Sequence, residues 1–222
     1  FTNSSLAMLS TTLVISLFLI LGLNKISLIP SKRQSLIEIS YEFIANMIND
    51  NVGKDGMKYL SFVFTLFLFI LLGNLLGMLP YSFTWTSHII VTFTISFFIF
   101  IGVTIIAIYK HGILKFLSFF APSGVPKPML ILLVPIEVIS YLSRPISLSV
   151  RLFANMMAGH TLLKVIGGFV FVLASNSYIV GGILPLSFLV ALTGLEIVIA
   201  FLQAYVFAIL TCLYINDAIH LH

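Results

Sequence analysis

Residues 59–109 contain no Asp, Glu, Lys or Arg, and neither does the segment before Lys25. A membrane-spanning helix needs about 20 predominantly apolar residues, so each stretch is long enough to cross a bilayer. The whole chain shares this character, because 60% of its residues are apolar and 8% are charged, whereas about 25% are charged in a soluble domain. Lipid leaves only helices or a closed barrel, and alternating strands of about ten residues are absent. The sequence therefore predicts an all-α, polytopic helical membrane protein.

Breaks in the apolar pattern divide this single membrane domain, residues 1–222, into about five membrane helices and one surface helix. The predicted elements are a first span at 6–29, a surface amphipathic helix at 31–52, a hairpin at 59–80 and 85–109, and a long hairpin at 129–173 and 178–217. The first span lacks a basic n-region and a cleavage pattern, so we interpret it as an anchor rather than a signal peptide. Trp85 is typical of a membrane interface.

The surface helix is predicted from apolar residues that recur at helical spacing among charged ones. These apolar residues are Leu36, Ile39, Phe43, Ile44 and Met47.

Basic residues predict the orientation. If the chain starts outside, the inner loops hold eight Lys and Arg residues, and the outer turns hold only Lys164. Basic residues favour the inner side, which also places the C-terminus there.

Two arginines, Arg144 and Arg151, lie inside the span predicted at 129–173. Inserting an arginine at the centre of a membrane helix costs roughly 2.5–3.5 kcal/mol, so two of them in one span indicate a specific role. At about 100° per residue, several polar residues lie within about 40° of Arg151. They are Glu137, Arg144, Ser147 and Asn155.

On the next helix Glu196 and Gln203 are seven residues apart and share a face. Polar stripes on consecutive helices predict either a hydrated path or a static network that joins the helices. Purely structural interpretations are also open. The Arg144 side chain can extend to the inner membrane surface, and His160 can lie at the membrane interface. Asn155 and Gln203 can form hydrogen bonds between helices.

Residues 147–160, SLSVRLFANMMAGH, closely resemble the signature of subunit a of the F-type ATP synthase. Further runs are similar to this family: GMLPYSF at 77–83, TSH at 86–88, ALTGLE at 191–196, LQAY at 202–205 and LYINDAI at 213–219. The resemblance covers essentially the whole chain and implies that the two long helices are tilted and pack against a c-ring.

The resemblance also implies residue roles. Arg151 matches the essential arginine that faces the c-ring. The outer proton half-channel is implied to contain His160, Glu196, Asn155 and Gln203. The inner half-channel is implied to contain Glu137 and Asp217, with Arg144 and Ser147 in support.

The chemistry of arginine fits this assignment, because its side chain keeps its proton and makes a fixed barrier rather than a relay. No further carboxylate of this chain lies opposite Arg151, so a proton-carrying acid has to come from another subunit. Two acids at one inner mouth, Glu137 and Asp217, would attract departing protons. We expect no catalytic residue, cofactor or metal site, and the chain lacks a Walker A run, so it is not an enzyme by itself.

The implied partners are the c-ring, a b-type peripheral-stalk subunit, small membrane subunits of Fo and lipid, with contacts between ATP synthase dimers as a further option. Nucleic acid is not expected, since the basic residues are scattered. The opening residues are similar to mature mitochondrial forms. We therefore expect the mitochondrial inner membrane, with the C-terminus on the matrix side, or alternatively an alphaproteobacterial plasma membrane.

Two other functions are compatible with parts of the sequence. A proton-coupled secondary transporter would also bury Arg and Glu, but it should show an internal repeat, which is not visible here. A non-conducting scaffold would explain the surface helix but not the polar stripes.

Overall fold

The computed structural model describes residues 2–23, 30–79, 82–119, 127–175 and 179–219, and these contain helices but no strand. In chain order the elements are α1 (Asn3–Leu23), α2 (Lys32–Val52), the 3-10 segment η1 (Lys54–Tyr59), α3 (Leu60–Gly77), the 3-10 segment η2 (Trp85–Ser87), α4 (Ile89–Phe119), α5 (Lys127–Ser175) and α6 (Ile179–Ile219). Within the described residues, five segments are long and apolar enough to cross a membrane. The predicted all-α, polytopic fold is confirmed.

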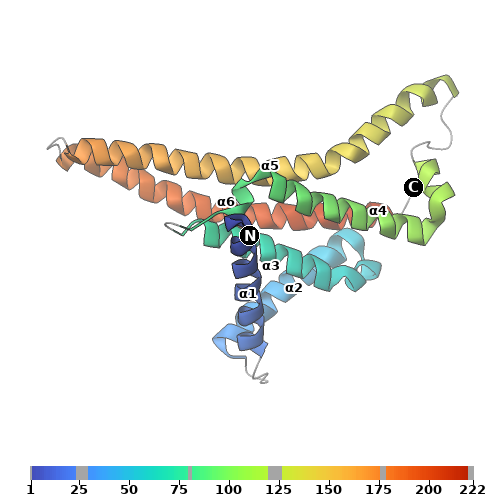
Figure 1. Ribbon diagram of the computed structural model, residues 1–222. Coiled ribbons are helices and arrows are strands. Elements are labelled where there is room, and N and C mark those ends of the chain that lie inside the picture. The colour runs from blue at the N-terminus through green and yellow to red at the C-terminus, as the bar shows by residue number, and fades with distance from the viewer. Residues whose placement is uncertain (1, 24–29, 80–81, 120–126, 176–178, 220–222) are drawn as a thin grey trace.

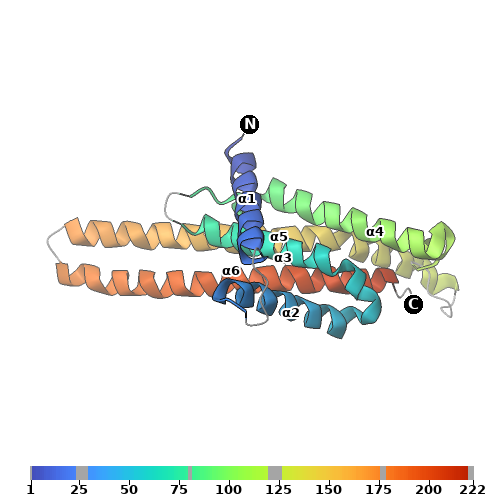
Figure 2. The ribbon, with the colours of Figure 1, turned by 90° about the horizontal axis from the view of Figure 1, so that it is seen from below.

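Helices α5 and α6 form a long antiparallel pair that extends past the other helices at one end (Figures 1 and 2). At the other end α6 also packs against α2, α3 and α4. The N-terminal part of α5 turns away from α6 in Figure 1. Pro135 and Pro145 lie inside this helix, and a proline removes one helical hydrogen bond and favours a bend.

Helix α3 supplies much of the core, to which α2, α4, α5 and α6 and one residue of α1 also contribute. Trp85 of η2 packs on α3 and is 1% exposed, with its ring centroid 4.8 Å from that of Phe69. A side chain at Gly73 would collide with the Trp85 indole, so glycine permits this close packing. The indole is thus buried between protein elements, and its position at the membrane interface stays a prediction.

Helix α2 begins after Ser31, whose hydroxyl accepts a hydrogen bond from the Gln34 N–H. The apolar residues that predicted the surface helix have different surroundings in the structure. Ile44 and Met47 are buried in the core, whereas Leu36, Ile39 and Phe43 are exposed. The division arises because α2 packs against α1, α3 and α6.

Helix ends differ from the predicted bounds in the first hairpin. Segment η2 occupies the start of the predicted second span, so α4 begins at Ile89. Helix α4 then continues to Phe119 across a kink at Gly112, where φ is 79°, a backbone conformation that favours glycine. The end of the predicted first span, residues 24–29, lies outside the described residues.

Candidate functional site

The outer part of the site is built where α5 and α6 face each other. His160 Nδ1 lies 3.9 Å from Glu196 Oε1. Glu196 is buried with 5% of its surface exposed, and His160 is half-buried. Gly159 makes room for the carboxylate, because a Cβ there would lie 2.5 Å from Glu196 Oε1. The structure thus brings together the two residues that the sequence assigned to one half-channel.

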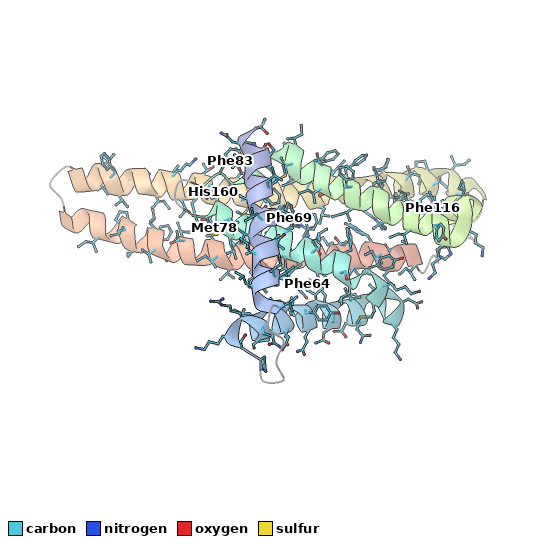
Figure 3. All side chains as sticks on the ribbon, turned by 60° about the horizontal axis from the view of Figure 1, so that its bottom comes forward. Phe64, Phe69, Met78, Phe83, Phe116 and His160 are labelled. Atoms are coloured by element: carbon cyan, nitrogen blue, oxygen red, sulfur yellow. The ribbon has the colours of Figure 1, made fainter. Side chains whose placement is uncertain are left out.

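Thr84 contacts the other side of the His160 ring. Its Oγ1 lies 2.9 Å from His160 Nε2 and donates a hydrogen bond of 2.8 Å to the Gly77 carbonyl. Figure 3 labels His160 where α5 passes the end of α3 and the segment before η2. Sequence reasoning missed Thr84, although it lies between two of the family-like runs, residues 77–83 and 86–88.

A cavity of about 220 Å³ lies between α5 and α6 beside Glu196. Asn155 and Gly159 are among the α5 residues that line it, and Ile199 lines it from α6. Neither carboxylate oxygen of Glu196 has a hydrogen-bond partner among the described residues. The cavity is large enough to admit water, which would hydrate this carboxylate.

A second polar side chain missed from the sequence lies close to Glu196. Asn74 of α3 is fully buried and donates from Nδ2 to the Ala200 carbonyl at 3.4 Å. Ala200 is one helical turn beyond Glu196 on α6. Helix α3 therefore contributes a buried amide to the polar surroundings of the outer cluster.

Arg151 lies at the middle of α5, because that helix runs from Lys127 to Ser175. It is exposed, as are Ser147, Ala154 and Asn155 nearby. No described residue forms an ion pair with Arg151. Gln203, on α6, is half-buried. The predicted stripe on α5 thus includes a solvent- or partner-facing arginine with small and polar neighbours.

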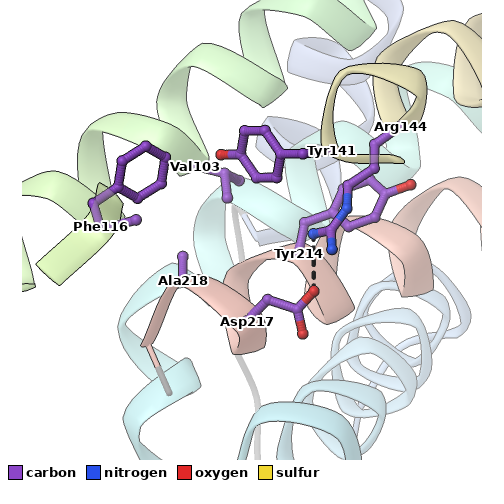
Figure 4. Close-up of a pocket in the computed structure, with 8 residues that line it drawn as sticks. Val103, Phe116, Tyr141, Arg144, Tyr214, Asp217 and Ala218 are labelled. Atoms are coloured by element: carbon purple, nitrogen blue, oxygen red, sulfur yellow. Dashed lines mark hydrogen bonds and ion pairs between the residues drawn. The ribbon is translucent and has the colours of Figure 1, made fainter. Parts of the chain in front are cut away.

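The inner part of the site is centred on an ion pair that the sequence did not predict. Arg144 Nη1 donates to Asp217 Oδ2 at 2.8 Å. The guanidinium carbon lies 5.3 Å from the Tyr141 ring centroid and 5.1 Å from that of Tyr214. Figure 4 shows these residues around a small cavity, with Phe116 at its edge. Arg144 is therefore held half-buried between α5 and α6, where cation–π contacts add to the ion pair.

Glu137 lies apart from this pair. It is half-buried in the N-terminal part of α5, between Pro135 and Pro145. It does not line the cavity around Asp217, and no described residue forms an ion pair with it. The structure thus pairs Asp217 with Arg144 rather than placing both acids in contact at one mouth.

The described residues thus form two polar clusters, one around His160 and Glu196 and one around Arg144 and Asp217. Arg151 lies between them on α5 without an ion-pair partner among the described residues. No group of three or more His, Cys, Asp or Glu residues suited to a metal ion occurs in the described part of the chain. Cys212 is buried as a free thiol.

Comparisons with known proteins lead to the same family as the sequence motifs. The family model described as ATP synthase A chain matches residues 5–216. The ATP synthase subunit a of Pelagibacter ubique is 62% identical over 222 residues, covering 100% of this chain and 89% of the relative. That of Allorhizobium ampelinum is 57% identical, covering 99% and 88%, and that of Rhodospirillum rubrum is 56% identical, covering 100% and 90%. These matches confirm the family predicted from the motifs.

Proposed function

Because the chain belongs to the ATP synthase A chain family, we propose that it is the proton-translocating stator subunit of an F-type ATP synthase. Two offset half-channels deliver protons to and from carboxylates of a c-ring, and Arg151 prevents a direct leak between them. Proton flow is thereby coupled to rotation and ATP synthesis. The chain is a channel component rather than a catalytic subunit.

The observation that carries this proposal is the position of Arg151, exposed at the middle of a helix long enough to span a membrane. A guanidinium facing lipid there would cost several kcal/mol, so a partner has to cover it. Ala154 and Ala158 lie on the same exposed side, and small residues let a neighbouring helix approach closely. A ring of helices that carry carboxylates meets both requirements.

The outer half-channel runs through Glu196 and His160 into the cavity between α5 and α6. Asn155 lines that cavity and lies four residues, about one turn, from Arg151. A proton that reaches the cavity is therefore close to the ring-facing surface beside the arginine. Gln203 of α6 supplies a further polar group in the proposed path.

The inner half-channel includes the Arg144–Asp217 pair, with Ser147 as a supporting residue and Glu137 as a separate acid. Asp217 lies 21 residues beyond Glu196 on α6, about 31 Å at 1.5 Å per residue. Arg151 lies between Arg144 and His160 on α5. This separation supports two half-channels that open at different depths and do not meet.

The chemistry of the side chains explains how the path avoids a short circuit. Arg151 keeps its proton and repels a proton approaching from either half-channel. A ring carboxylate beside Arg151 is stabilised in its charged form, whereas a carboxylate facing lipid moves only after it is protonated. Each proton therefore travels with the ring, and crossing 100 mV releases about 2.3 kcal/mol that a leak would waste.

The chain is a multi-pass membrane protein, and its relatives named above are bacterial. We therefore favour the plasma membrane of a bacterium over the mitochondrial inner membrane, with the C-terminus on the cytoplasmic side. Beyond the c-ring, the proposed partners are a b-type peripheral-stalk subunit and small membrane subunits of Fo. Contacts between two ATP synthases stay a prediction.

The test is ATP-driven proton pumping by the intact ATP synthase in liposomes. Arg151→Lys keeps the charge but lacks the planar fork, and a buried lysine can lose its proton. We expect pumping to disappear, while the c-ring still copurifies with the variant chain and shows that the complex assembles. Pumping near the wild-type rate would refute the barrier role. Isolation of the chain as an active monomer without a ring would favour a secondary transporter instead.

A further inference from the structure

We propose that Thr84 is a positioning residue that holds His160 in one tautomer, with Nε2 protonated and Nδ1 turned toward Glu196. This inference rests on the proposed role of His160 and Glu196 in the outer half-channel. It adds a residue outside the long hairpin, from the segment between α3 and η2, to the proton path.

The direction of each hydrogen bond follows from counting protons. The Thr84 hydroxyl has a single hydrogen, and the Gly77 carbonyl can only accept. The 2.8 Å bond between them therefore uses that hydrogen. At the 2.9 Å contact with His160, Thr84 Oγ1 must accept, and Nε2 must carry a hydrogen to donate. In the neutral ring Nδ1 is then the unprotonated nitrogen.

Packing keeps the Thr84 hydroxyl in place. Thr84 is 8% exposed, and a Cβ at Gly77 would lie 2.5 Å from Thr84 Cγ2, so glycine allows the two backbones to approach. The branched side chain of threonine has restricted rotation. The next residue, Trp85, is buried against α3 and fixes the following backbone. The acceptor for His160 is thus built into the core rather than placed on a free loop.

The consequence concerns the other ring nitrogen. Nδ1 lies 3.9 Å from Glu196 Oε1, which is longer than a hydrogen bond, so transfer needs a small rotation of Glu196 or one bridging water. When Glu196 is protonated, its O–H bond breaks and an N–H bond forms at Nδ1, giving a carboxylate and an imidazolium. The reverse step returns the proton. A ring with Nδ1 already protonated and no charge could not accept it.

The charged groups that act on His160 are few among the described residues. Glu196 faces it from α6, and Lys164 lies one turn further along α5. From the α3 and η2 side the ring is hydrogen-bonded by the uncharged Thr84 hydroxyl, with the Gly77 carbonyl behind it. Removing the hydroxyl therefore changes the hydrogen bonding of the ring without changing any charge.

The experiment measures proton flux through the intact complex in liposomes as a function of pH on the outer side. Thr84→Val keeps the shape and removes the hydroxyl, and Thr84→Ser restores it. We expect Thr84→Val to lower flux about tenfold, since the Gly77 carbonyl and the His160 N–H each lose a hydrogen-bond partner. We also expect the midpoint of the flux-against-pH curve to move to lower pH in Thr84→Val, because the protonated His160 ring loses a charge-assisted hydrogen bond. Thr84→Ser should recover most of the flux and the wild-type midpoint.

Thr92→Val is the matched control, because Thr92 is also buried and its hydroxyl donates to the local carbonyls of His88 and Ile89, at the start of α4. It should leave the pH profile unchanged. A wild-type profile in Thr84→Val, or a Thr84→Ser variant as impaired as Thr84→Val, would overturn the positioning role. A pH shift of equal size in Thr92→Val would overturn it as well.

Glu196→Gln separates this inference from the proposed function. Normal flux in Glu196→Gln would refute the outer path itself, whereas loss of flux there with normal flux in Thr84→Val would refute only the role of Thr84. If Thr84→Val fails to assemble, nitrogen NMR of the histidine-labelled wild-type complex decides, with His160→Gln identifying the signal. We expect Nε2 protonated and Nδ1 bare in the neutral ring; the opposite tautomer would refute the proposal.

Discussion

Gly159 gives a way to move the Glu196 carboxylate without changing its chemistry. In Gly159→Ala the new Cβ would lie 2.5 Å from Glu196 Oε1, whereas ordinary carbon contacts are about 3.5 Å or longer. The carboxylate must therefore retreat by about 1 Å from a position 3.9 Å from His160. A misplacement of about 1 Å can cost roughly a hundredfold in rate when a transfer depends on alignment.

We expect ATP-driven proton pumping by Gly159→Ala to fall by about ten- to a hundredfold. Assembly should survive, because alanine favours a helix more than glycine does. Gly168→Ala is the control, since a Cβ at Gly168 of the same helix has no described atom within 4 Å. Adding Glu196→Asp shortens the acid and should recover part of the activity lost in Gly159→Ala. Wild-type pumping in Gly159→Ala would refute the tight alignment of the outer site.

Three further outcomes follow from the contacts. Glu196→Gln should slow proton flux strongly while the ring still copurifies, because an amide cannot exchange a proton; normal flux would mean that the acid only braces the helices. Asp217→Asn and Glu137→Gln should each reduce flux moderately. In the double variant the two losses should multiply, because Asp217 is paired with Arg144 and Glu137 does not line its cavity. A loss greater than the product, measured at fixed membrane potential, would indicate that the two acids share one mouth. Gly73→Ala should lower the free energy of unfolding by about 1–3 kcal/mol, because the new methyl group collides with Trp85. An unchanged thermal unfolding curve would argue against that packing.

Local patterns in the sequence predicted the membrane helices, because a long apolar run is sufficient to indicate a span. The pairing of His160 with Glu196 came from the family resemblance, and the structure places the two side chains face to face. Contacts that join distant segments could not be predicted in this way. Thr84 meets His160 76 residues later in the chain, and Asp217 meets Arg144 across two helices.

Two details of the packing could not be predicted, for the same physical reason. An aromatic residue between apolar runs is typical of a membrane interface, but a glycine in α3 creates a site where Trp85 packs inside the protein. Likewise, helical spacing identifies the apolar side of α2 but does not say which part faces other helices and which part stays exposed. In a membrane protein both surroundings are apolar, so composition alone does not distinguish them.

The most direct test of the barrier role of Arg151 is proton leakage through a complex whose c-ring cannot turn. The ring is joined covalently to the stator outside the membrane, a potential of about 100 mV is applied across the liposomes, and proton flux is recorded. With Arg151 present we expect no flux, because every proton must travel with the ring. In Arg151→Ala we expect flux to continue although the ring is fixed, since the two half-channels then communicate directly. An Arg151→Ala complex as impermeable as the wild type would contradict the proposal that this side chain separates them.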